Sequence, residues 1–300
     1  MKCSNFWIAA VLAAAAIVLA GCNNDETENE SLKLSDVAIE VTAGIFTDLP
    51  QTRVIGTAWE TGDAIGIFQL LDKTVKDANR AYVNVGTAAF MPKTPGEAIY
   101  FPVETAVKSD FIAYFPYKVG QTGLDYVVNV AWQADQEAID LLTADKQTGR
   151  DKNNPILAFN FKHRLSKLAL TLAAGYGLTD FELKGINVTM TEQLTAATCD
   201  LNTGMLIASG KTHDIILKTT SNGLQSEAII LPAEATPGRQ LVFTLKNGDV
   251  YRWDIPADKA FHAGEKNIYL ITLNRTSIAV TATITDWTYG NGSGEAGNAE

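Results

Sequence analysis

Residue types that often carry catalysis or bind metals are sparse in this sequence. It has three histidines, at positions 163, 213 and 262, and none has a second His or Cys at the spacing of a zinc site. His163 continues the alternation of Phe159 and Phe161, so we expect it at the edge of a packed apolar face. His213 and His262 stand in turn-like contexts. The sequence therefore predicts no metal site.

Motifs that position a nucleophile or a phosphate group are also missing. The segment GNGSGEAG holds a serine among glycines, but it lacks the following helix that a hydrolase elbow requires. No glycine-rich run ends in Lys-Ser or Lys-Thr, as a phosphate-binding loop does. The 34 acidic residues include no pair that a motif marks for sugar hydrolysis. We therefore expect neither an enzyme nor a bound cofactor.

Tryptophans are the remaining candidates for small-molecule binding, because exposed aromatic rings on a β-sandwich can bind glycans. Trp253 shares a strand face with Tyr251 and Ile255, so we expect it in the core. The sequence does not assign Trp59 or Trp132 to an apolar strand face, so these two residues are the candidates for glycan contact.

Cys22 is the position with the most specific chemistry. Lys2 and the apolar run from Phe6 to Ala20, shorter than the roughly 18–20 residues that cross a bilayer, are typical of a secretory signal peptide. The run ends in Leu-Ala-Gly-Cys, which resembles a bacterial lipobox and predicts a lipoprotein signal peptide over residues 1–21. Cys22 would then carry the acyl chains, palmitate among them. The alternative is ordinary cleavage beside an incidental cysteine. If Cys22 is lipidated, Cys199 has no disulfide partner in the mature chain.

The charge pattern limits the kinds of partner. Residues 22–31 contain NNDETENE, which has no apolar residue and predicts a solvated acidic tether. The formal net charge of the chain is −10, and its basic residues are scattered. An acidic surface of this kind repels phosphate backbones, so we expect no binding to nucleic acid.

Arg53 lies in a segment suited to proteolysis. It follows Leu-Pro-Gln-Thr, which predicts an exposed, non-helical loop, and no acidic residue lies within two positions of it. Such a basic side chain is what the pocket of a trypsin-like protease requires. The alternative is an ordinary surface loop with an arginine that pairs with an acid in space.

Short alternating runs separated by turn residues dominate the rest of the chain and predict an all-β fold. Lys246 to Asp249 contain Asn-Gly between two such runs, which predicts a tight hairpin. Sustained helical spacing is almost absent, although residues 135–147 could hold a helical turn, and FELKGINVTM (181–190) favours a strand. We predict two β-sandwich domains, over residues 32–165 and 166–289, and a flexible tail over 290–300.

Four segments in order resemble the fimbrillin-like proteins of Bacteroidetes. They are TRVIGTAWETGDAIGIF (52–68), DFIAYFPY (110–117), FNFKHRLSKLALTL (159–172) and YLITLNRTSIAVTATITDW (269–287). The resemblance spans nearly all of the chain after the signal peptide. It implies two transthyretin-like β-sandwich domains and a lipoprotein precursor anchored in the outer membrane at the cell surface. It also implies a subunit of protease-dependent type V pili (fimbriae) with a role in adhesion.

The resemblance further implies how such a subunit assembles with other pilin subunits, as a homopolymer or a heteropolymer. A trypsin-like processing protease would cut after Arg53 and release the first strand, around residues 37–46. A strand of a neighbouring subunit would then fill the groove. The donor-strand candidate here alternates apolar and small polar residues and presents one face through Ile278, Val280, Ala282 and Ile284.

Residues 288–300, TYGNGSGEAGNAE, are unlike a strand that inserts to its end. The chain could therefore be an accessory, tip or anchor subunit. A separate alternative is a monomeric surface lipoprotein, an adhesin that binds a glycan or a host protein through its exposed aromatic residues.

Overall fold

The computed structural model describes residues 36–45 and 59–286. Among these residues, strands make up 56% and helices 3%, so the all-β prediction is confirmed. The predictions for the signal peptide, the tether, Cys22, Arg53 and the tail lie outside the described residues. Within those residues, the helical segments are all too short or too polar to span a bilayer.

The N-terminal strands form a sheet that closes on itself. The order β2-β3-β4-β1-β9-β7-β5 is completed by pairing between β2 and β5, which gives a 7-strand barrel-like ring, and β8 pairs with β5 outside it. This ring differs from the open transthyretin-like sandwich that was expected, so two tandem domains of that kind stay a prediction. The elements are β1 (Glu40–Ile45), β2 (Ala64–Leu71), β3 (Thr74–Asn84), β4 (Ala89–Pro92), η1 (Pro95–Glu97), β5 (Ser109–Phe115), β7 (Leu142–Ala144), β8 (Gln147–Arg150) and β9 (Ile156–His163).

Alternation in the sequence decides which side chains fill this ring. In β9, Leu157, Phe159 and Phe161 are buried, whereas the residues between them are exposed or partly exposed. The strands β2 and β5 are instead buried on both faces, because one face packs in the core of the ring and the other packs outside the ring, in a different core cluster. This explains why their sequences are continuous apolar runs.

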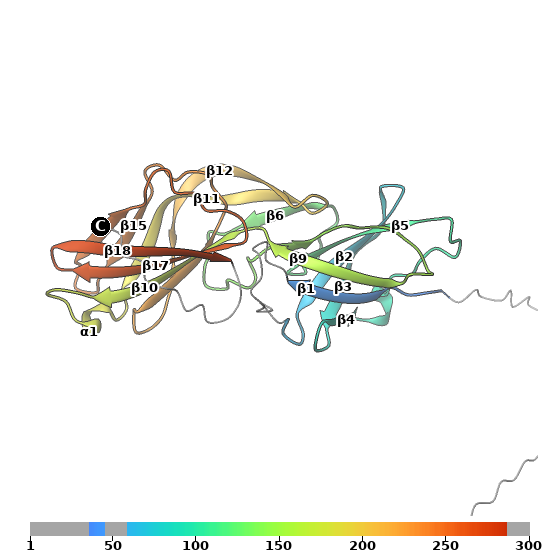
Figure 1. Cartoon of the computed structure of the whole chain (residues 1–300), viewed down its shortest axis with the longest axis horizontal. Coiled ribbons are helices and arrows are strands. Elements are labelled where there is room, and N and C mark those ends of the chain that lie inside the picture. Colours follow the sequence, from blue (N-terminus) through green and yellow to red (C-terminus); the bar gives the residue numbers. More distant parts are fainter. Residues whose placement is uncertain (1–35, 46–58, 287–300) are drawn as a thin grey trace, which may run out of the picture. The chain divides into compact units, whose positions relative to one another are not determined.

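The C-terminal strands form two sheets that pack on each other (Figure 1). One sheet has the order β13-β14-β10-β17-β18, and the other has β12-β11-β15-β16, with β6 also paired to β11. Leucines, isoleucines and phenylalanines from both sheets share one core cluster. The elements are β6 (Asp125–Asn129), β10 (Ser166–Ala174), α1 (Asp180–Leu183), β11 (Asn187–Asp200), β12 (Met205–Ile216), β13 (Lys218–Thr219), β14 (Gln225–Ile230), β15 (Gln240–Thr244), β16 (Val250–Asp254), β17 (Glu265–Asn274) and β18 (Ser277–Asp286).

Two local predictions have different outcomes. The Asn-Gly hairpin is confirmed, because β15 and β16 pair around it and Gly248 has a φ of 93°, which favours glycine. The strand predicted from residue 181 is wrong at its start. Residues 180–183 form α1, whose first turn is held by Thr179 and Glu182 in a capping box, and the strand begins at Asn187.

A third core cluster joins side chains from β2, β5, β6, β11 and β14. The expected domain boundary at residues 165–166 falls between β9 and β10, and this cluster holds residues from both sides of it. The division into separate domains at this boundary therefore stays a prediction.

Candidate functional site: the first strand and its slot

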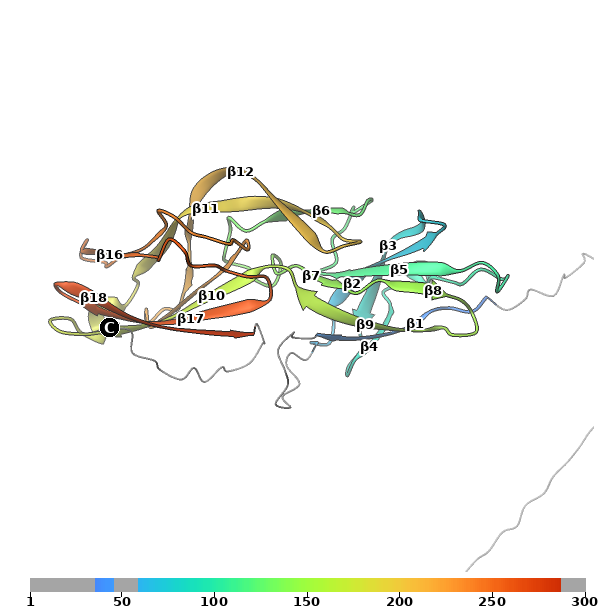
Figure 2. The same ribbon diagram turned by 45° about the horizontal axis from the view of Figure 1, so that its top comes forward.

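The first strand occupies an interior position in the N-terminal ring. β1 pairs in parallel with β9, from Glu40 opposite Ile156 to Ile45 opposite Phe161, and antiparallel with β4 on its other side. Figure 2 shows β1 lying beside β9 and β4. We call the position between β4 and β9, with Trp59 at its end, the β1 slot. An interior strand cannot leave without opening the sheet on both sides.

Further main-chain hydrogen bonds fix the residues at the start of β1. The N–H of Ile39 donates to Ile99 O at 3.0 Å, and the N–H of Glu40 donates to Pro155 O at 2.9 Å. Ala43 N–H donates to Ala88 O at 2.9 Å. If β1 left its slot, these acceptors would lose their partners, and unpaired backbone groups in a buried setting are unfavourable.

The inward face of β1, together with Ile39 just before it, is buried except at Ile45, which is partly buried. Ile39, Val41 and Ala43 are 3–5% exposed, whereas Glu40 and Thr42 face solvent. Burying an isoleucine or valine side chain contributes about 1.5–3 kcal/mol, so loss of this face from the core would cost several kcal/mol. The slot is therefore apolar along its whole length as well as rich in backbone hydrogen-bonding groups.

Trp59 closes the slot at the C-terminal end of β1. Its Nε1–H donates to the backbone carbonyl of Ala43 at 3.0 Å. Its ring makes edge-on contacts with Phe90, Phe115 and Phe161, at centroid distances of 5.2–5.4 Å. Because Trp59 is 9% exposed, it belongs to the core, and its expected role in glycan contact is wrong.

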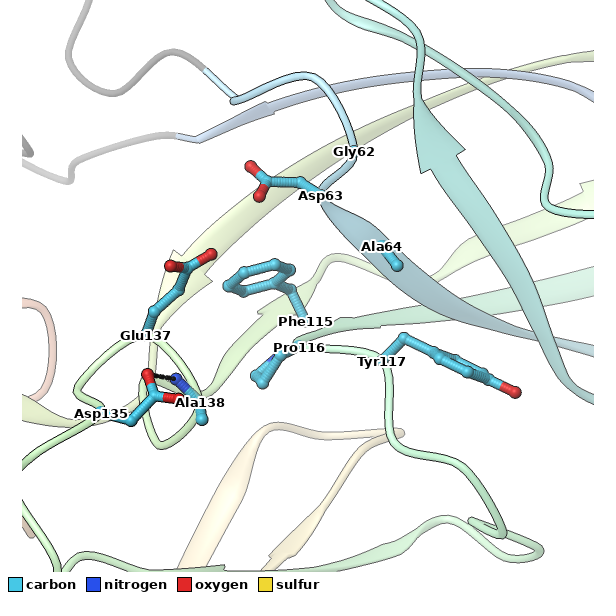
Figure 3. Close-up of a pocket in the computed structure, with 9 residues that line it drawn as sticks. All are labelled: Gly62, Asp63, Ala64, Phe115, Pro116, Tyr117, Asp135, Glu137 and Ala138. Atoms are coloured by element: carbon cyan, nitrogen blue, oxygen red, sulfur yellow. Dashed lines mark hydrogen bonds between the residues drawn. The ribbon is translucent and has the colours of Figure 1, made fainter.

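An acidic hollow lies at the start of β2 and the end of β5 (Figure 3). A cavity of about 320 Å³ is lined by Asp63, Asp135 and Glu137 together with Phe115, Pro116 and Tyr117. Burial raises the pKa of the Asp63 carboxyl, which accepts a hydrogen bond from the Glu60 N–H at 2.8 Å. Burial and then the charge of Asp63 raise the pKa of Glu137. Among the described residues, no group of three or more His, Cys, Asp or Glu is placed to hold a metal ion.

The donor-strand candidate, β18, lies at the edge of its sheet. Within the described residues it pairs only with β17, antiparallel from Asn274 opposite Ser277 to Glu265 opposite Asp286. Ile278 and Val280 pack partly against the C-terminal core, but Ile284 is 53% exposed and Ala282 is exposed. The predicted apolar face is therefore covered only over the first half of the strand.

Of the other candidate residues, His163 and Trp253 pack inside the protein and Trp132 is exposed. His163 is buried, and its Nδ1 lies 2.9 Å from Asp140 Oδ1, which confirms its predicted place on a packed face. Trp253 packs partly against the C-terminal core, with its ring 5.2 Å from that of Tyr269. Trp132 is 75% exposed and stays a candidate for ligand contact.

Cys199 is expected to be unreactive in the folded protein. Its side chain is buried, and burial raises the pKa of its thiol to about 11. At pH 8 only about one thiol in a thousand would be ionised, and the thiolate is the nucleophile. We predict negligible labelling by iodoacetamide in native buffer and complete labelling in denaturant, read by intact mass on a Cys22→Ser chain that lacks the signal peptide. Rapid labelling in native buffer would contradict the burial of this thiol.

The described residues thus form an all-β protein whose first strand is interior and whose last strand is at an edge. The family model for fimbrillin-like proteins matches residues 52–287, and the chain belongs to this family. A relative from Bacteroides uniformis, named for a fimbrium subunit, Fim1C, is 41% identical over 298 residues, which cover 95% of this chain and 96% of the relative.

Two crystal structures are similar to this chain. A crystal structure from Bacteroides uniformis, described as a cell adhesion protein, is 39% identical to this chain with a TM-score of 0.75, and the match covers 85% of this chain and 99% of that one. A second crystal structure with the same description, from Bacteroides ovatus, is 21% identical with a TM-score of 0.69 and covers 86% and 100% of the two chains. The second likeness shows a common fold.

Proposed function

We propose that this protein is a structural or accessory subunit of a fimbria at the cell surface, with a role in adhesion. Its precursor is a lipoprotein of the outer membrane, and it assembles by strand exchange after proteolysis at Arg53. The observation that carries this proposal is the interior position of β1 between β4 and β9. Membership of the fimbrillin-like family, and the name of the relative from Bacteroides uniformis, support it.

Cleavage after Arg53 would separate β1 from the rest of the chain, because residues 40–45 precede the cut. The family match begins at residue 52, so the matched region is almost the whole of what would remain. Release of β1 would expose the apolar slot and the main-chain groups of β4 and β9. An incoming strand can fill the slot with its apolar side chains and pair its backbone with β4 and β9, which is the physical basis of strand addition.

Incubation of the purified chain with a trypsin-like protease tests this proposal. We expect an early cut after Arg53, seen by mass spectrometry, followed by assemblies whose size grows with protein concentration and which resist mild denaturant. The uncut chain at the same concentration is the control. A chain that is cut after Arg53 and remains monomeric at all concentrations would contradict strand exchange.

Lipidation is tested separately. We predict that Cys22→Ser abolishes incorporation of a labelled fatty acid and moves the protein from the membrane fraction to the soluble fraction, because no other cysteine lies at the signal-peptide boundary. A Cys199→Ser chain is the matched control and should keep its label. Equal labelling of the Cys22→Ser chain and the native chain would exclude the lipoprotein assignment.

Exposure of Trp132 favours a second candidate function, an adhesin that binds a glycan or a host protein as a monomer. Trp132 is 75% exposed, and an aromatic ring in this position can stack on a sugar. A glycan-array signal that is lost in Trp132→Ala, from a chain that forms no assemblies, would support this function instead.

A further inference from the structure

A second hollow, beside β6, adjoins the acidic hollow. Its volume is about 330 Å³, and Pro116, Tyr117 and Ala138 line both hollows. One wall of the second hollow is β6 itself, from Tyr126 to Asn129. We propose that the two hollows form one groove, the β6 groove, which binds an extended segment of a partner protein with a basic side chain at the acidic end. This site is distinct from the β1 slot, because β6 is not part of the N-terminal ring, and it goes beyond the proposed function.

The free edge of β6 offers backbone hydrogen-bonding groups to such a segment. Hydrogen bonds from Val130 N–H to Thr195 O and from Leu201 N–H to Leu124 O show that the even-numbered residues of this segment face β11. In an antiparallel pair the residues between them point their N–H and C=O groups to the opposite side, so those of Val127 point away from β11. Within the described residues β6 pairs only with β11, so a strand of another chain can pair with Val127.

The second hollow lies along this edge of β6. Four consecutive residues, 126–129, line it. Side chains of a strand alternate between its two faces, so a hollow on one face would contact every second residue instead. The edge also accepts donors, because Gln121 Nε2 donates to Asp125 O at 2.9 Å. The groove therefore meets β6 at the backbone, which is the geometry of strand addition.

The acidic end of the β6 groove favours a basic side chain. The carboxylates of Asp63 and Glu137 lie beside the ring of Phe115, and all three residues line the first hollow (Figure 3). Burial, and then the charges of Asp63, Glu60 and Asp135, raise the pKa of Glu137. A Lys or Arg side chain in this hollow would offset the repulsion between the carboxylates, and an aromatic ring beside it attracts a cation.

The other end of the groove carries the opposite charge. Lys118 lines the second hollow, and its Nζ lies 5.0 Å from the centre of the Tyr126 ring. Complementary charges decide which partner binds and how it is oriented. The occupant is therefore expected to place a basic residue near Glu137 and an acidic or neutral residue near Lys118.

Peptide binding to the uncut chain tests this inference. The protein is the Cys22→Ser chain that lacks the signal peptide, and the probe is the fluorescein-labelled peptide KGTVTVTE. We expect saturable binding, read by fluorescence polarisation, that weakens as salt is raised. The peptide QGTVTVTE, which lacks the basic side chain, should bind about tenfold more weakly or worse. A probe with N-methyl groups on every Thr and Val has no N–H to offer β6 and should not bind.

Two pairs of variants locate the site. Glu137 and Glu104 are both exposed, and Glu104 lies before β5, whereas the groove lies at the end of that strand. We expect Glu137→Lys to weaken probe binding by about tenfold or more, and Glu104→Lys, with the same change of net charge, to leave it unchanged. Val127→Pro removes the free N–H without removing a bond to β11, so it should abolish binding, whereas Val127→Thr should retain it. Melting temperatures show that each variant is folded.

Several results would overturn the inference. They are no saturable binding of the probe, equal affinity for KGTVTVTE and QGTVTVTE, and equal effects of Glu137→Lys and Glu104→Lys. Self-association of the uncut chain that Glu137→Lys abolishes would assign the groove to a second copy and overturn a separate basic partner. None of these measurements involves cleavage at Arg53, so their failure leaves the proposed function in place, and failure of strand exchange leaves this inference in place.

Discussion

An Arg53→Ala chain is expected to stay a single unassembled subunit under conditions in which the native chain, once treated with a trypsin-like protease, assembles. The protease requires a basic side chain in its pocket, and alanine removes it. Because β1 is paired on both sides and its inward residues Val41 and Ala43 are 3–4% exposed, it should not leave the slot while it remains covalently attached. The measurements are fragment masses and light scattering over a series of concentrations.

The matched control is Arg53→Lys, which keeps the charge and remains a substrate for a trypsin-like protease. It should be cut and should assemble. Both variants should have the melting temperature of the native chain, which separates loss of cleavage from loss of folding. Assemblies of normal size formed by Arg53→Ala would exclude cleavage at this residue as the trigger.

A Trp59→Ala chain is expected to lose about 3–5 kcal/mol of its free energy of unfolding, the usual cost of truncating a buried aromatic side chain. Three aromatic neighbours and the hydrogen bond to Ala43 O depend on this ring. Removal of the indole ring should also make β1 less stable in its slot, because the ring covers the C-terminal end of the slot. Urea unfolding followed by circular dichroism gives the free energy.

Two further variants sharpen this prediction. Trp132→Ala removes an exposed ring and should change the free energy of unfolding by no more than about 0.5 kcal/mol. Trp59→Phe keeps most of the apolar contact and loses the hydrogen-bond donor, so its loss should lie between those of the two alanine variants. Equal effects of Trp59→Ala and Trp132→Ala would contradict the packing described for Trp59.

The fold was predictable from the sequence where the information is local. Alternation in β9 and β18, and the Asn-Gly pair before Val250, predict strands and a hairpin that the structure contains. The short helix α1 was also within reach, since Thr179 and Glu182 have capping-box spacing, but the apolar residues after them favoured a strand.

The closure of the N-terminal ring was not predictable in this way. It depends on pairing between β2 and β5. Likewise, β6 lies outside the ring and pairs with β11, far along the chain, instead of with its neighbours in sequence. Periodicity gives the face of a strand but not its partner, because pairing over such separations is decided by the packing of the whole core. For the same reason the sequence placed Trp59 among the surface candidates, although it is a core residue.

The site was predicted in part. Apolar alternation identified the residues of β1 and β18 as strands, and the family resemblance supplied the idea that one could replace the other. The interior position of β1 and the incomplete burial of β18 came from the structure, because both depend on which strands lie alongside.

The parallel pairing of β1 with β9 has a consequence for the fibre. A strand that takes the place of β1 must enter with the same direction, so every subunit would join its neighbour in the same orientation. The contact would be head-to-tail and open, which generates a filament instead of a closed ring of fixed size when the rotation does not close. Such a filament is polar: one end presents a vacant groove and the other presents an unused terminal strand. Growth at one end and capping at the other would therefore require different molecular partners.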